Sequence, residues 1–325
     1  MSKETLDFVV LFEGKKLFHI QVSNNNTGIN RFYKRIKQHI KVDQEHWLLC
    51  MEHTGIYCNP LLEYSNGKGL SVWLEDASRI RAYHGLERGK DDALDAFRIA
   101  EYAYAKKEKT MLYKAPRKII DKIKTIIKLR ERLVTTKTRL LAPLKEEKRF
   151  GDKQLAREHE KLLKPVIDKV IKQIQLVEKK IQKLIKEDEH LRRLYGLITS
   201  VQGVGFVTAI NTLVVTNEFK KITEPKKMAC HCGVAPFKYD SGTSIRSKAK
   251  VSHRANKSMK TLLHLAAMSA ISCNGELKDY YLRKVEEGKN KMAVINAVRN
   301  KIIHRMFVCV RENRKYEKIY SPVLV

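Results

Sequence analysis

Lys90-Asp91-Asp92-Ala93-Leu94-Asp95-Ala96-Phe97 begins a pattern typical of an amphipathic helix. Asp92 and Asp95 are three residues apart, so a helix would place both carboxylates on one face, one turn apart. Two acids on one face of a strongly basic chain suggest a divalent metal ion held near a phosphodiester. The alternative is that these acids only cap the helix and oppose its dipole, and on this stretch alone the alternative is favoured.

Residues 1–108 are expected to alternate strands with helices around this stretch. Apolar runs predict strands near residues 6–12, 17–22, 46–51 and 70–74, with helices over 29–40 and up to about 66, and an Arg- and Gly-rich loop up to Lys90. This order predicts an α/β layer with a partly parallel sheet, in which active residues gather at the carboxyl ends of strands. Glu52 stands at such an end and is a candidate third metal ligand; an ordinary strand-end acid is the alternative.

Residues 109–196 have a different texture, in which glycine almost vanishes and Lys, Ile, Leu and Glu dominate. Apolar residues recur every seven positions in two complementary sets: Ile167, Ile174 and Ile181, and Val170, Val177, Leu184 and Leu191. This seam predicts two long antiparallel helices, as an intramolecular hairpin or a dimerising coiled coil, with interruptions at Pro143, Gly151 and Pro165. An oligomerisation arm is favoured over a plain two-helix core piece, because the seam is narrow and charge surrounds it.

Residues 197–325 open with a helix-hairpin-helix pattern around Gly203-Val204-Gly205. Glycines there let the backbone approach a DNA phosphate at the N-terminus of the next helix, although simple helix packing explains the turn equally well. Ser241-Gly242 follows in a polar loop, and apolar helices are expected near 262–270 and 293–310. Basic residues that could bind DNA or RNA follow the serine densely: Arg246, Lys248, Lys250, His253, Arg254, Lys257 and Lys260.

Ser241 admits two interpretations. In a cationic loop, a serine can attack phosphorus while Arg and Lys stabilise the transition state. It can also be an ordinary turn serine beside a phosphate-binding patch, which the local Asp-Ser-Gly composition favours.

The whole chain has 325 residues and a formal net charge of +29. Such a charge predicts a polyanionic partner, and nucleic acid is favoured over a membrane surface. Neither an apolar run long enough to span a bilayer nor a signal segment is present, so a cytoplasmic protein is expected. The six cysteines are scattered, as expected of reduced packing residues, and Cys230-His231-Cys232 is a weak zinc candidate because it has no second ligand pair at finger spacing.

Together these motifs resemble a family of insertion-sequence transposases that join an N-terminal DEDD nuclease-like domain to a C-terminal serine-bearing domain. These are the bridge-RNA-guided DNA recombinases, related to site-specific DNA invertases. The resemblance rests on four motifs in the family's order: Glu52-His53-Thr54-Gly55-Ile56-Tyr57, Lys90 to Ala96, the Gly203–Ala209 hairpin, and Gly233-Val234-Ala235-Pro236 leading to Ser241-Gly242.

The resemblance implies a ribonuclease H-like α/β domain over 1–108, a helical coiled-coil arm over 109–196 and a mainly α serine domain over 197–325. It further implies that Glu52, Asp92 and Asp95 bind Mg²⁺, that Ser241 is a nucleophile toward DNA, and that a structured guide RNA and a dimer or tetramer are involved. The chain is thus expected to be a DNA transposase or recombinase. A metal-dependent junction nuclease and a decayed, non-catalytic nucleic-acid-binding protein are the alternatives.

Three departures from the family pattern are visible. The strand that carries the family's first aspartate is expected just before Met1, and the activity of the chain would be impaired if that strand were missing. Asp7 matches a later strand position. Ala255 replaces a usual glycine. Lys260 replaces a usual arginine, which keeps the charge but loses bidentate phosphate geometry.

Overall fold

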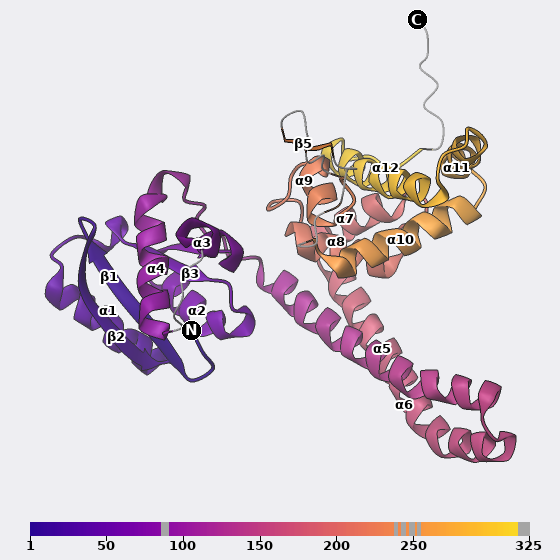
Figure 1. Ribbon diagram of the computed structural model, residues 1–325, viewed down its shortest axis with the longest axis horizontal. Helices are drawn as coiled ribbons and strands as arrows, with labels where there is room; N and C mark the ends of the chain where they lie inside the picture. Colours follow the sequence, from indigo (N-terminus) through magenta and orange to yellow (C-terminus); the bar gives the residue numbers. More distant parts are fainter. Residues whose placement is uncertain (86–90, 237–239, 242–244, 247–250, 252–254, 318–325) are drawn as a thin grey trace, which may run out of the picture. The chain divides into compact units, whose positions relative to one another are not determined.

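The computed structural model describes residues 1–85, 91–236, 251 and 255–317 in full, and the backbone at 240–241 and 245–246. The chain forms two compact units, Met1–Ala115 and Pro116–Val325 (Figure 1). Within the described ranges, no helix has the length and apolar character needed to cross a bilayer.

The first unit is an α/β unit built from two strand pairs, β1–β2 and β3–β4. The antiparallel hairpin and the parallel pair predicted from the sequence are both confirmed. Hydrogen bonds do not join the two pairs into one sheet in the part of the unit that the structure describes. The elements are β1 (Thr5–Phe12), β2 (Lys15–Ser23), α1 (Asn26–His39), β3 (Leu48–Glu52), α2 (Asn59–Gly67), β4 (Ser71–Glu75), α3 (Ala77–His84) and α4 (Asp92–Ala105), with 3₁₀ turns at Gln44–His46, Gly55–Cys58 and Lys107–Lys109.

Helices cover both faces of the β1–β2 hairpin, because successive side chains of a strand point to opposite faces. Leu6 and Phe8 on one face are buried against α1, where the rings of Phe8 and Phe32 stack 3.7 Å apart. On the other face α4 runs along β1 (Figure 1). Its Tyr102 contacts Trp73 of β4, with ring centroids 5.3 Å apart. Helix α4 therefore contacts both strand pairs, and its position decides where the acids of the opening motif lie.

The prediction of a loop between β4 and Lys90 is wrong in its first half, because Ala77–His84 forms helix α3. Asp76 caps this helix by accepting a hydrogen bond from the backbone N–H of Ser78 at 2.7 Å, and Gly85 ends it with a φ of 73°. Only Ile80 of the helix is buried. A single apolar anchor among Arg, Tyr and His gives too little periodicity for sequence reasoning to detect.

The second unit is helical apart from two short strands. Helices α9 and α11 were not predicted, while the apolar helices expected near 262–270 and 293–310 are confirmed as parts of α10 and α12. The elements are α5 (Lys118–Phe150), α6 (Lys153–Glu187), α7 (Glu189–Thr199), α8 (Phe206–Thr216), α9 (Pro225–His231), β5 (Asp240–Ser241), β6 (Ile245–Arg246), α10 (Lys257–Ser272), α11 (Glu276–Glu286) and α12 (Lys291–Arg311).

Helices α5 and α6 are the two long helices that the heptad pattern predicts, and they pack side by side (Figure 1). The prediction that Pro143 and Pro165 interrupt the helices is wrong, because both prolines lie inside continuous helices. The predicted interruption at Gly151 is confirmed, since this glycine ends α5. A proline removes one helical hydrogen bond. Here that loss is outweighed because the helices pack along their length, with Leu144 and Ile167 buried beside the prolines.

The seam of the long helices continues into the core of the second unit. Val177 and Ile181 of α6 belong to the same buried cluster as Ile210 of α8, Leu263 of α10 and Ile302 of α12. The base of the helix pair is therefore part of the core of the helical unit.

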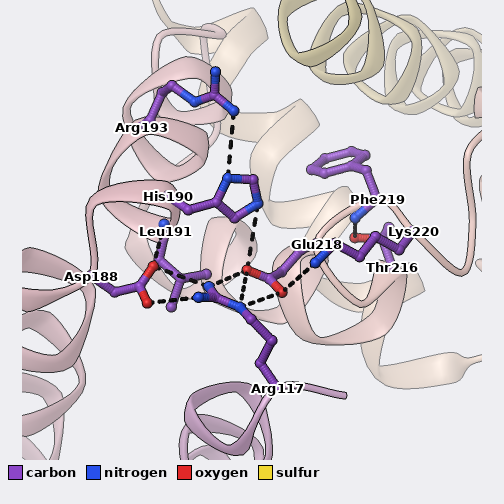
Figure 2. A network of polar contacts seen from close by, with 9 residues as sticks. All are labelled: Arg117, Asp188, His190, Leu191, Arg193, Thr216, Glu218, Phe219 and Lys220. Carbon is purple, nitrogen blue, oxygen red and sulfur yellow. Dashed lines mark hydrogen bonds and ion pairs between the residues drawn. The ribbon is translucent and has the colours of Figure 1, made fainter. Parts of the chain in front are cut away.

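A buried ion network fastens the start of α5 to this core (Figure 2). Arg117 forms two hydrogen bonds with Asp188, of 2.8 and 3.0 Å, and further ones with both carboxylate oxygens of Glu218. The Glu218 side chain is fully buried, and His190 and Lys220 also face it, at 3.6 and 3.5 Å. Donating hydrogen bonds to Glu218 and then to Asp188 raises the pKa of Arg117, and accepting the hydrogen bond from Arg117 lowers the pKa of Asp188.

Candidate functional site

The acidic motif occupies the N-terminus of α4, as predicted. The capping role belongs to Asp91, whose Oδ1 accepts a hydrogen bond from the backbone N–H of Ala93 at 3.2 Å. Asp92 and Asp95 are both exposed in the first turn, and Asp95 forms an ion pair with Arg98 at 3.3 Å. Because a different aspartate caps the helix, capping does not explain Asp92 and Asp95.

Glu52 ends β3, at the carboxyl end where the strand order predicts active residues. It stands in register with Glu75 at the end of the parallel strand β4. Glu75 is 5% exposed, accepts a hydrogen bond from the hydroxyl of Tyr102 at 3.1 Å and lies 3.6 Å from Arg79. Sequence reasoning missed Glu75, although an acid directly after the apolar run of β4 was a signal equal to that of Glu52.

A metal-ligand set does not form among the described side chains. No group of three or more His, Cys, Asp or Glu residues in the described ranges is close enough to hold a metal ion. Glu52, Asp92 and Asp95 are thus not assembled into a three-carboxylate site. The cause lies in the helix: Tyr102, which meets Glu75, is seven residues beyond Asp95, and seven residues of helix span about 10 Å.

Asp92 instead borders an open pocket of about 480 Å³ between α4 and the hairpin. The opposite wall is formed by Asp7, His19 and Gln21. The Asp7 side chain is only 4% exposed and accepts hydrogen bonds from Gln21 at 3.2 and 3.3 Å, with the Nε2 of His19 at 3.1 Å. Cross-strand pairing with β2 brings the partners of Asp7 together, and no local pattern in the sequence marks Asp7 for this role.

In the second unit the glycine turn between α7 and α8 has the predicted helix-hairpin-helix arrangement. Gly203 has a φ of 87°, and a Cβ added there would lie 2.2 Å from the carbonyl oxygen of Ala266 in α10. Gly205 stands at the N-cap of α8 with open space around it. Packing against α10 therefore accounts for Gly203, whereas Gly205 is the glycine at which a DNA backbone could approach.

Gly203→Ala is expected to destabilise the second unit by about 3 kcal/mol, because the methyl group meets backbone and the φ is left-handed. Thermal or denaturant unfolding of the whole chain measures this. Gly205→Ala is the matched control, with an expected loss below about 1 kcal/mol because an alanine N-cap is only a weaker cap. Equal losses for the two variants would contradict the assignment.

The serine segment is described only in part. The backbone of Ser241 in β5 pairs with Ile245 of β6, which makes a short hairpin. The side chains of Ser241 and Arg246, and residues Lys90, Gly242, Lys248, Lys250, His253 and Arg254, lie outside the described part of the structure. Lys257 is exposed and Lys260 is half-buried at the start of α10. The structure therefore places two of the seven predicted basic side chains, both on one helix.

Two family patterns match the chain, and the first of them extends past the first unit into α5. The pattern of a family described as Transposase matches residues 1–146, and that of the Transposase IS116/IS110/IS902 family matches residues 195–282. The pilin gene-inverting proteins of Moraxella lacunata and Moraxella bovis are each 22% identical over 278 residues, which are 84% of this chain and 77% of theirs. An insertion element IS110 protein of Streptomyces coelicolor is 27% identical over 124 residues, 38% of this chain and 30% of that protein.

Proposed function

We propose that this chain, which two transposase family patterns match in part, cuts and rejoins DNA strands to mobilise an insertion sequence. The observation that carries the proposal is the order of the two matched regions along one chain, 1–146 and 195–282. The similarity to proteins named for pilin gene inversion supports DNA rearrangement over simple binding. The net charge of +29 fits a DNA substrate.

Ser241 is the proposed nucleophile. Its Oγ attacks phosphorus, a P–O bond to the DNA forms, and the deoxyribose oxygen leaves with the serine proton. The phosphoserine ester keeps the energy of the broken phosphodiester, so attack by another DNA hydroxyl can rejoin the strands without a further energy source. Lys257 and Lys260 begin α10, the helix that follows the serine segment in the sequence, and their positive charge would stabilise the developing negative charge.

Asp92 and Asp95 are the proposed metal-binding pair, because both are exposed, one turn apart and not needed as the cap. Together with Glu52 they do not complete a ligand set, so the described protein residues alone do not fit a three-carboxylate Mg²⁺ site. Mg²⁺ usually keeps several waters and binds one or two carboxylates plus substrate phosphates, which an exposed pair satisfies. When bound, the cation would polarise the phosphodiester.

A homo-oligomer and a structured guide RNA complete the proposal, the RNA from family resemblance alone. The oligomer has support in α6. Leu155, Leu162 and Leu176 occupy one heptad position and are 50%, 74% and 55% exposed. Lys169 occupies the same heptad position between Leu162 and Leu176, so the leucines form an interrupted apolar stripe outside the seam that α5 covers. Exposed apolar positions of this kind favour association of helices.

The proposal is tested by DNA joining with the purified full chain. A supercoiled plasmid carrying the gene with its natural flanking DNA serves as substrate, with and without co-expressed RNA and Mg²⁺. Asp92→Asn is expected to lower joining at least about 100-fold, as loss of a metal-polarised phosphate contact would. Asp91→Asn is the control, because it keeps the N-cap.

A second measurement does not depend on activity. Mg²⁺ in the presence of DNA should raise the melting temperature of the wild-type chain and not that of the Asp92→Asn, Asp95→Asn double variant, because a ligand that binds only the native state stabilises it. Full joining by Asp92→Asn would refute the metal role. Hydrolysed DNA without joined product would favour a junction nuclease, and neither product would favour a non-catalytic binding protein.

A further inference from the structure

Arg299 of α12 is a buried cation that no described carboxylate neutralises. It is 6% exposed, and no ion pair joins it to an acid within the described ranges. Its Nε is buried without a hydrogen-bond partner there, and its Nη1 reaches Asn296 Oδ1 only at 3.4 Å. Burial lowers the pKa of Arg299. A buried charge without a counter-ion is destabilising, so Arg299 can be stabilised by an anion that the described residues do not supply.

Arg305, six residues further along the same helix, has a counter-ion, although its Nη1 is also buried without a hydrogen-bond partner among the described residues. Its Nη2 lies 2.6 Å from Glu276 of α11, and its guanidinium lies 4.6 Å from the ring centroid of Tyr316. Helix α12 therefore carries one compensated and one uncompensated arginine. The pair offers a matched comparison in which size, charge and helix are constant.

The strongest contact of Arg299 is with a histidine. Its Nη2 lies 2.6 Å from the Nδ1 of His264 in α10. A guanidinium only donates, so Nδ1 must accept, and the imidazole is neutral with its proton on Nε2. Burial and then the Arg299 charge lower the pKa of His264, which agrees with this state. His264 is half-buried. Arg299 thus fixes the tautomer of His264 in which Nε2 carries the proton and can donate a hydrogen bond.

The surroundings of this pair are cationic and adjoin the chain that leads to Ser241. Lys260 is one turn before His264 on the same face of α10. A Cβ added to Gly233 would lie 3.7 Å from Lys260 Cδ, and Asn296 Nδ2 donates to the carbonyl oxygen of Val234 at 2.7 Å. Gly233 and Val234 lie a few residues before β5 in the sequence. The contact between α10 and α12 therefore brings hydrogen-bond donors and positive charge together beside Gly233 and Val234.

We propose that Lys260 and the Nε2–H of His264 bind a phosphodiester oxygen of DNA, with Arg299 as the positioning residue behind them. These donors are held in place before the ligand binds, and no described acid neutralises their charge. They can therefore bind an oxyanion without reorganisation. The choice of DNA as ligand rests on the proposed recombinase function. Arg299 acts through His264, and its charge is compensated only when the phosphate is bound.

The test combines melting temperature with DNA affinity for the full chain, using a double-stranded oligonucleotide over a series of salt concentrations. Arg299→Met is expected to raise the melting temperature, because it removes an uncompensated charge and keeps the volume. It should also reduce the slope of log affinity against log salt by about one, because the positive charge that the bound phosphate would compensate is lost. Arg305→Met should lower the melting temperature and leave the salt slope unchanged.

His264 supplies a second, independent variant. His264→Gln keeps an acceptor for Arg299 and an N–H donor, and should retain the wild-type affinity and slope. His264→Leu should weaken DNA binding at every salt concentration and leave the slope unchanged, because a neutral imidazole donates a hydrogen bond but releases no counterion. If Arg299→Met instead lowers the melting temperature and leaves the slope unchanged, Arg299 is a structural residue and the proposal is overturned.

The same variants separate this inference from the recombinase proposal. A slope that changes for a structured RNA and not for DNA would also overturn the inference. Because affinity needs no strand cleavage, a chain that never joins DNA would refute the recombinase function and leave this measurement intact. Conversely, normal DNA joining by the wild-type chain does not support the proposed role of Arg299. That role is supported only if Arg299→Met changes the salt slope as expected.

Discussion

Ser241→Ala is expected to abolish the covalent protein–DNA adduct and to lower strand joining at least about 10³-fold, because no other group replaces the nucleophile. A nicked suicide substrate, which lets the leaving strand diffuse away, traps the adduct on a denaturing gel. DNA affinity should stay within about twofold of wild type, since the removed hydroxyl carries no charge. The effect is therefore a loss of chemistry at constant binding.

Ser244→Ala is the control for this experiment, because it lies in the same polar segment three residues away. It should form adduct and joined product like the wild type. If Ser241→Ala still joined DNA, the serine mechanism would be wrong. If the wild type cut DNA and Ser241→Ala lost cutting without any adduct ever being trapped, a hydrolytic nuclease with a phosphate-binding serine would be the better description.

Arg117→Met is expected to destabilise the second unit by about 3 kcal/mol, near the lower end for breaking a buried ion pair. The change leaves the fully buried Glu218 and the Asp188 carboxylate without their shared guanidinium (Figure 2). We place the value near the lower end because the Arg117 side chain is itself 36% exposed and Lys220 remains 3.5 Å from Glu218. Denaturant unfolding followed by far-ultraviolet circular dichroism measures the loss.

The double variant Arg117→Met, Glu218→Leu provides the decisive comparison. Removing both partners leaves no uncompensated charge, so it should recover most of the stability that Arg117→Met loses. Arg305→Met, which breaks the more exposed pair with Glu276, should cost less than about 1 kcal/mol. A double variant as unstable as the sum of its single variants would show that Arg117 and Glu218 do not depend on each other.

Local patterns in the sequence determined most of the architecture. Alternating apolar residues were enough for the β1–β2 hairpin, and the heptad repeat of Ile167, Ile174 and Ile181 was enough for the two long helices, since both are properties of short segments. The same reasoning failed at Pro143 and Pro165, where packing along the helices outweighs the local preference to stop. It failed again at α3, whose single apolar anchor gives no period.

The candidate site divides in the same way. The sequence by itself determined that Asp92 and Asp95 share a helix face, because three residues make one turn, and that Glu52 ends a strand. Only the tertiary structure decided which acids and cations meet. Asp7 and Asp92 line one pocket through the packing of α4 on β1, and Arg299 meets His264 through the packing of α10 on α12, across 35 residues. Such contacts depend on how whole elements pack, and no local period of the sequence encodes that.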